Sequence, residues 1–159
     1  FLSQFNLEGD ELHILYIGIL PNFLGSVLFL MCFMQGGRPS ENLNRIWAFV
    51  QADYRHHAIE NKYGNLSLGS FLADVDSPRK DYPCLKGRGL EIRDILGPLR
   101  RVWTRFRNDR TYQFELVEEA MVSIDNACCI RTKNGENVFL PLADAAQLKL
   151  ECNCFWKAL

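Results

Sequence analysis

The chain lacks several patterns that would assign it to a common functional class. Its six cysteines include no paired C-x-x-C or Cys…His spacing of the kind that holds structural zinc. The stretch "KGRG" at residues 86–89 does not supply the G-x-x-x-x-G-K-[ST] spacing of a phosphate-binding loop. The net charge of −1 gives the chain as a whole no attraction to nucleic acid. These absences argue against a zinc finger, a P-loop protein and a uniformly basic nucleic-acid-binding protein.

The cysteines also lack the spacing of a secreted disulfide scaffold. Cys128 and Cys129 are adjacent, Cys152 and Cys154 are one residue apart, and Cys32 lies inside an apolar run. Such spacing favours reduced, buried thiols in an intracellular protein.

No charged side chain occurs in the 22 residues from His13 to Met34, "HILYIGILPNFLGSVLFLMCFM". The run is long enough to cross a bilayer, which needs about 20 apolar residues. However, Pro21 lies near its middle, Gly25 interrupts it, and no Lys/Arg cluster flanks it. The preceding "FLSQFNLEGDEL" is acidic and does not resemble a signal peptide. We therefore predict a buried helix that starts or breaks at Pro21 in a protein without a membrane partner, and a small membrane protein stays an alternative.

The remaining pattern is mainly helical and predicts a single domain, 1–159. Four further helices are expected at about 40–62, 89–107, 111–130 and 141–159, with Ser40 as an N-cap and Gly64 as a stop signal. The apolar run is expected to pack, through Leu24, Val27, Leu28 and Met31, on the helices that carry Trp47 and Trp103. Residues 3–9 suggest a short strand, and residues 66–75 a strand or a short helix. Because the chain begins on Phe1, we expect it to be part of a longer protein.

Charge is distributed unevenly along the chain. Between residues 79 and 110 there are ten basic and four acidic side chains, which makes the segment +6 and leaves −7 for the rest. One face of the protein is therefore expected to be basic even though the whole chain is not.

Two short motifs carry a family resemblance. "GDELH", followed by "YIG" and the apolar run, resembles a segment of ribonuclease H-like transposases in which an acid, two residues and a histidine precede "LG" and an apolar helix. The matching residues are Asp10, His13 and Ile17-Gly18. A second stretch, "LKGRGLEIRDILGPL", is similar to the later motif of the same families, with Glu91 as its acid and Arg93 as its arginine. The resemblance points to CACTA-like element proteins and covers most of residues 7–107.

The resemblance implies an α/β fragment, the latter part of a ribonuclease H-like core with a helical insertion (1–110), followed by a C-terminal helical extension (111–159). It also implies that Asp10 and Glu91 hold Mg²⁺ or Mn²⁺ for DNA strand cleavage and transfer, which uses two metal ions, and that His13 orients them. The expected partners are DNA, the remainder of the parent protein or a second copy, and the expected location is the nucleus. An earlier acid that such enzymes need is missing here, so we expect no cleavage by this chain alone.

Each of these residues also has an ordinary structural interpretation. Asp10 could be a helix N-cap or a loop acid, and Glu91 could simply complement the dipole at a helix start. Among the basic residues, Arg101, Arg105, Lys86 and Arg88 are the predicted DNA contacts, whereas the seven-residue repeat of Lys86, Arg93, Arg100 and Arg107 predicts a solvated stripe. The competing function is a non-catalytic helical module that binds DNA or protein.

Overall fold

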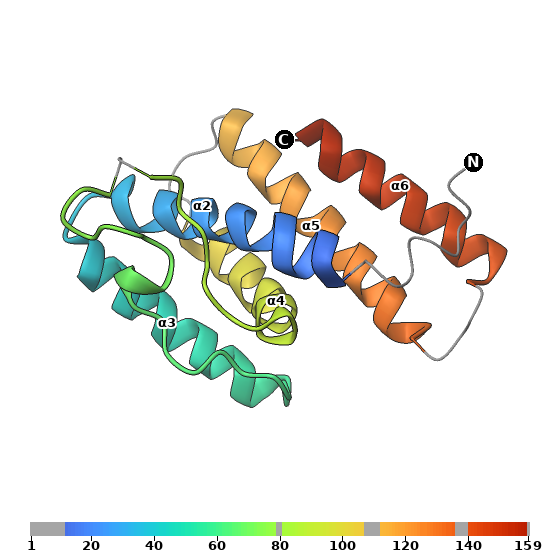
Figure 1. Ribbon diagram of the computed structural model, residues 1–159, viewed down its shortest axis with the longest axis horizontal. Coiled ribbons are helices and arrows are strands. Elements are labelled where there is room, and N and C mark those ends of the chain that lie inside the picture. The colour runs from blue at the N-terminus through green and yellow to red at the C-terminus, as the bar shows by residue number, and fades with distance from the viewer. Residues whose placement is uncertain (1–11, 79–80, 107–111, 136–139, 159) are drawn as a thin grey trace. The chain divides into compact units, whose positions relative to one another are not determined.

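The computed structural model describes residues 12–78, 81–106, 112–135 and 140–158. Its elements, in chain order, are the π-helix η1 (Leu12–Ile19), α2 (Leu20–Phe33), α3 (Pro39–His56), the 3-10 turn η2 (Leu68–Ser70), α4 (Gly89–Phe106), α5 (Tyr112–Lys133) and α6 (Leu142–Ala158) (Figure 1). The prediction of a mainly helical chain is confirmed. Within the described ranges no residue forms a strand, so the ribonuclease H-like core remains a prediction. The strand suggested at 3–9 lies outside these ranges.

The chain divides into two compact units, Phe1–Val102 and Trp103–Leu159. Helix α4 contributes to both, because its last turn is joined to α5 by the stacked rings of Trp103 and Phe114, whose centroids are 5.2 Å apart. The family resemblance implied a boundary after residue 110, eight residues further on, because a short motif cannot show this aromatic contact.

The apolar run forms η1 and α2, and the change from π- to α-helical geometry comes at Leu20, just before Pro21. Leu24, Val27, Leu28 and Met31 are all buried, as predicted, and α2 packs against α3, the helix of Trp47. In the described residues Tyr16–Phe33 is the one helix long and apolar enough to cross a membrane. A core helix of a soluble protein has the same length and composition, so the burial of this face favours a core role.

Asn42 fixes the turn between α2 and α3. Its side-chain amide is buried and donates hydrogen bonds to the carbonyl oxygens of Cys32 (2.9 Å) and Gly36 (3.1 Å). Cys32 lies in the last turn of α2, where a helix leaves its carbonyl acceptors unpaired, and Gly36 follows the helix. The N-cap of α3 is Arg38 with Pro39 in the first turn, and not Ser40 as predicted, since proline suits the first helical position.

Helix α3 ends at His56, earlier than the predicted stop at Gly64. Ala58 adopts a left-handed backbone conformation, with φ of 49°, immediately after the C-cap His57. Such a residue ends a helix whatever its type, although glycine is usual there. The sequence therefore carried no signal for this boundary.

The long segment between α3 and α4 crosses α2 at very close range. The backbone N–H groups of Cys84 and Lys86 donate to the carbonyls of Phe71 and Ser70, both at 2.8 Å, and the N–H of Leu85 donates to the carbonyl of Pro21 at 2.8 Å. Residues 66–75, predicted as strand or helix, contain only the short turn η2. The segment 84–86 thus lies between residues 70–71 and helix α2, hydrogen-bonded on both sides.

In unit 2, helices α5 and α6 pack against each other (Figure 1). Side chains join them along their length, with Asn126 donating to Glu151 at 3.3 Å and Asn134 donating to Asp144 at 2.8 Å. The six cysteines, all in described ranges, form no disulfide. Only Cys32 and Cys128 are buried, so the prediction of buried thiols is wrong for the other four, and burial raises the pKa of Cys32 to about 12.

Gly25 permits the close crossing and generates a stability prediction. A Cβ atom added to Gly25 would lie 2.7 Å from the backbone of Pro83 and Cys84. Replacing glycine by alanine inside a helix normally stabilises it by about 1 kcal/mol. Here we expect Gly25→Ala to lower the free energy of unfolding by about 1–3 kcal/mol, because backbone atoms cannot move aside as a side chain can. Urea denaturation followed by circular dichroism measures this change.

Gly36→Ala is the matched control, since nothing lies within 4 Å of its added Cβ. It should leave stability within about 0.5 kcal/mol of the parent. Equal stability for the Gly25→Ala variant and the parent would contradict the close contact.

Candidate functional site

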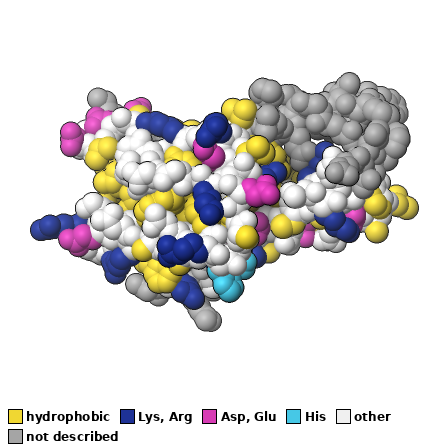
Figure 2. Space-filling model, turned by 90° about the horizontal axis from the view of Figure 1, so that it is seen from below, with side chains coloured by type: hydrophobic (Ala, Val, Ile, Leu, Met, Phe, Trp, Pro, Cys, Tyr) yellow, Lys and Arg dark blue, Asp and Glu magenta, His cyan; other side chains and the backbone are white. Residues whose placement is uncertain are grey.

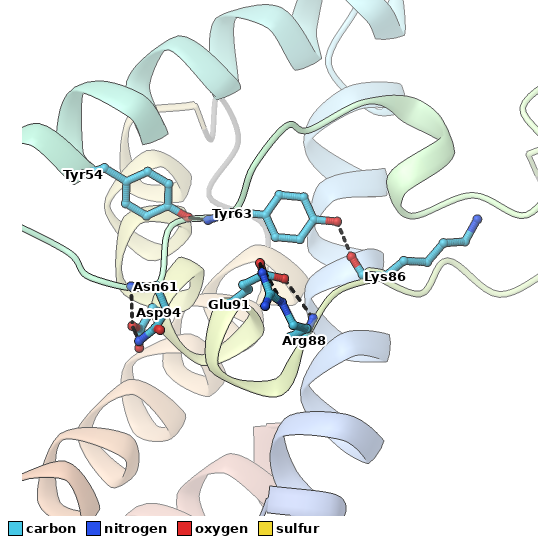
Figure 3. A network of polar contacts seen from close by, with 7 residues as sticks. All are labelled: Tyr54, Asn61, Tyr63, Lys86, Arg88, Glu91 and Asp94. Carbon is cyan, nitrogen blue, oxygen red and sulfur yellow. Dashed lines mark hydrogen bonds and ion pairs between the residues drawn. The ribbon is translucent and has the colours of Figure 1, made fainter.

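The first turn of α4 brings together two residues that the sequence singled out, Arg88 and Glu91 (Figure 3). Arg88 precedes the helix and accepts its first backbone hydrogen bond, from the N–H of Ile92. Glu91 reaches back, and its Oε2 accepts the N–H of Arg88 at 3.0 Å. Its Oε1 accepts the Arg88 guanidinium at 3.0 Å. Glu91 therefore caps the helix in the way that a glutamate three residues after an N-cap does.

The site keeps Glu91 ionised. The hydrogen bond from the Arg88 backbone N–H, reinforced by the Arg88 guanidinium, holds the pKa of the Glu91 carboxyl below its ordinary value of 4.5. The Glu91 side chain is 19% exposed, whereas that of Arg88 is 88% exposed. The carboxylate is thus fixed in one orientation, while its partner remains able to move into solvent.

A second carboxylate, Asp94, lies one turn further along α4 and belongs to a separate part of the network. Its Oδ2 accepts the side-chain amide of Asn61 at 2.8 Å, and its Oδ1 accepts Nε of Arg93 at 2.5 Å. Figure 3 shows Asn61 meeting Asp94 on the side of the helix away from Lys86. Asp94 therefore ties the chain after α3 to α4 and is already paired.

Two tyrosines complete the network. The hydroxyl oxygen of Tyr54 accepts the backbone N–H of Tyr63 at 3.2 Å, and the hydroxyl of Tyr63 donates to the carbonyl of Lys86 (Figure 3). Burial raises the pKa of Tyr54 to about 12, so its hydroxyl stays protonated. Together the tyrosines connect α3 to the residues just before Arg88, and they position the start of α4.

The structure leaves the predicted acid pair untested. Asp10 lies outside the described residues, and His13 lies in η1 with only its backbone described. The distance between Asp10 and Glu91 therefore stays a prediction. In the described ranges no group of three or more His, Cys, Asp or Glu side chains comes together. Both oxygens of Glu91 are engaged by Arg88. The described residues by themselves therefore do not fit a two-metal site.

All four predicted DNA contacts interact with other residues of the chain. Arg101 forms a bidentate ion pair with Asp53 of α3, in which Nε donates to Oδ1 at 2.7 Å and Nη2 donates to Oδ2 at 2.6 Å. Lys86 donates from Nζ to the carbonyl of Gly69 at 2.9 Å, and Arg88 holds Glu91. Arg105 is exposed and belongs to unit 2. Phosphate would have to compete with these internal partners. The affinity for DNA is therefore expected to be lower than the number of basic residues suggested.

The predicted solvated stripe also needs correction. Lys86 lies before α4, which begins at Gly89, so it does not continue the helical repeat. Arg93 is only 25% exposed and pairs with Asp94. Arg107 lies outside the described residues. In Figure 2, lysine and arginine side chains are scattered over the visible described surface, with apolar side chains between them, and form no single basic patch.

Sequence reasoning missed Asp53, Asn61 and Asp94 as parts of this network. Asp53 and Arg101 are 48 residues apart, and Asn61 and Asp94 are 33 apart. No local spacing signals such pairs, because each depends on how α3 lies beside α4.

No family model matches the chain, and no curated protein or solved structure matches it. The transposase resemblance therefore stays a prediction from the residues themselves.

The cap at Glu91 predicts a pH-dependent contribution to stability. Because the folded-state pKa is lowered, the contribution is complete above pH 4.5 and is lost as the pH falls through the folded-state value. We expect Glu91→Gln to cost about 1 kcal/mol at pH 7, since a charged hydrogen-bond acceptor is lost. The difference between the two proteins should narrow below pH 4.5. Urea denaturation at a series of pH values measures it.

Glu115→Gln provides the matched control, because Glu115 is also an acid in the first turn of a helix, α5. It should show a smaller effect, from the helix dipole alone, of about 0.5 kcal/mol. A cost for Glu91→Gln that stays constant from pH 7 to pH 3 would show that the ionised carboxylate is not what stabilises the cap.

Proposed function

We propose that this chain is the helical latter part of a transposase-like catalytic core, and that it holds the acid Glu91 in place without cutting DNA by itself. The proposal is supported by the ionisation, orientation and burial of the Glu91 side chain. The residue that the family resemblance selects as an acid is ionised, oriented and only partly exposed at the start of a helix. An ionised oxygen is what Mg²⁺ or Mn²⁺ prefers, and a bound ion would have to displace the Arg88 guanidinium, which is 88% exposed, from Glu91.

The surrounding network supports a scaffolding role for the rest of unit 1. The start of α4 is held by Tyr63 through the carbonyl of Lys86, and further along the helix by Asn61. Arg101 then joins α4 to Asp53 of α3. Functional groups built on rigid elements keep their geometry better than groups on loops. The first acid of the core, and with it the complete metal site, would come from sequence outside this chain.

Asp10 and Glu91 should act together on a divalent ion if the proposal holds. We expect Mn²⁺ at millimolar concentration to bind the chain weakly, with Asp10→Asn and Glu91→Gln each removing that binding. The double variant should lose nothing further, because both oxygens serve one ion. Electron paramagnetic resonance of free Mn²⁺ measures the bound fraction.

Asp144→Asn is the matched control, since Asp144 is another carboxylate whose pKa is lowered by its partners, Asn134 and Lys133. It should bind Mn²⁺ like the parent. Binding that survives both single substitutions, or none in the parent, would contradict the proposal.

DNA binding by the chain should be weak and independent of sequence. Non-specific affinities are on the order of 1–100 μM, and each neutralised phosphate adds roughly −0.9 to the salt slope. Arg88 and Arg105 are exposed, whereas Arg101 is half-buried in its ion pair with Asp53, so the first two are the contacts to change. Because Arg88→Ala also removes the guanidinium from Glu91, Glu91→Gln is the control for that loss. Arg88→Ala with Arg105→Ala should weaken binding and flatten the slope in a fluorescence anisotropy titration.

Arg55→Ala with Lys62→Ala is the control, because both side chains are exposed and neither is a predicted DNA contact. These changes should affect binding less. Equal losses from the two pairs would contradict the choice of Arg88 and Arg105 as the DNA contacts. No binding at about 100 μM protein and low salt would contradict DNA as a partner.

A further inference from the structure

Helix α6 of unit 2 is apolar on both of its faces, and only one of them packs on α5. Phe155 is buried, whereas Leu142, Leu150 and Trp156 are 88%, 54% and 59% exposed. At 100° per residue these three exposed side chains fall within an arc of about 120°. No described residue of unit 2 covers this arc, and apolar side chains exposed together on one helix face mark an interaction surface.

Charge is sorted between the two faces of α6. The acids Asp144 and Glu151 project toward α5, where Asn134 and Lys133 bond the first and Asn126 bonds the second. The lysines Lys149 and Lys157 are exposed and fall inside the arc of Leu142, Leu150 and Trp156. The exposed arc therefore combines apolar anchors with positive charge and contains no acid. We call it the α6 face: Leu142, Ala146, Lys149, Leu150, Asn153, Trp156 and Lys157.

The composition of the α6 face selects among possible partners. A second copy that docked the same face would bring lysines against lysines, so a symmetric pairing of α6 faces is disfavoured. DNA phosphates would use the two lysines but would leave Trp156 and Leu150 unburied. An amphipathic helix with apolar and acidic residues complements both features, and exposed tryptophan is a common anchor at such interfaces.

We propose that the α6 face binds an acidic amphipathic helix of a partner protein. The partner's apolar side chains cover Leu142, Leu150 and Trp156, and its carboxylates pair with Lys149 and Lys157. This interaction does not depend on the metal or DNA roles of unit 1.

Trp156 makes the proposal measurable in the full chain. Trp103 is fully buried and Trp47 is half-buried, so acrylamide should quench mainly the emission of Trp156. The probe is a synthetic three-heptad helical peptide without tryptophan, with leucine at the core positions and glutamate on either side. We expect it to protect Trp156 from quenching, and a matched peptide with lysine for glutamate to bind about ten-fold more weakly, because each of two partly exposed ion pairs contributes roughly a factor of three.

Charge reversal tests the assignment directly. Lys149→Glu with Lys157→Glu should reverse the preference, so that the lysine peptide binds about ten-fold more tightly than the glutamate peptide. Arg55→Glu with Lys62→Glu, which changes two exposed cations of unit 1, should leave the preference unchanged. Leu150→Ala should weaken both peptides, and Trp156→Phe should remove the quenchable emission, which identifies its source.

Several results would overturn the proposal. They are equal binding of the two peptides, no protection by either, or an unchanged preference after charge reversal. Trp156 that is already protected in the chain alone would show that the face is covered by the chain itself or, if sedimentation detects dimers, by a second copy. Protection by vesicles of phosphatidylserine and phosphatidylcholine, without protection by the peptide, would assign the face to a lipid surface instead.

Discussion

The contact between the backbone of Pro83-Cys84 and Gly25 is the constraint on which the start of α4 depends. A side chain at position 25 would separate the two backbones, since its Cβ would lie 2.7 Å from them. With glycine there, the segment 84–86 bonds to α2 on one side and to residues 70–71 on the other. Arg88 follows directly, and the position of Arg88 determines where Glu91 can cap the helix. A glycine in α2 thus controls the geometry of an acid 66 residues later.

Ion pairs inside the chain engage several cations of its basic segment, residues 79–110. The local charge of +6, which already subtracts Glu91 and Asp94, suggested a surface for phosphate, yet Arg88 lies against Glu91 and Arg101 pairs with Asp53 outside the segment. Arg93 likewise pairs with Asp94. The pair of Arg101 with Asp53 joins α3 to α4, whereas the other two pairs lie at the start of α4, so part of the positive charge serves the fold. A formal charge count measures attraction to DNA only for cations that have no closer partner.

The polar network and the exposed apolar side chains lie in different units of the chain. Unit 1 contains the polar network at the start of α4, where every carboxylate of Figure 3 has a hydrogen-bond partner. Unit 2 contains the α6 face, where apolar side chains and lysines are exposed together. The stacked rings of Trp103 and Phe114 place the last turn of α4 with α5. The Trp103 indole N–H is buried and has no acceptor among the described residues, which is consistent with a contact made for its apolar area.

The sequence by itself determined the helical class, the approximate positions of the five α-helices and most of their buried faces. Leu24, Leu28 and Ile46 could be predicted as core because helical periodicity is a local property of the chain. The start of α3 at Pro39, its end before Ala58 and the partners of Glu91 and Arg101 were decided by the tertiary structure. Those features depend on backbone conformation and on contacts across as many as 48 residues, and no short pattern encodes which helix will lie beside which. The candidate site was therefore only partly predictable: Glu91 and Arg88 could be named, whereas Asp53, Asn61 and Tyr63 could not.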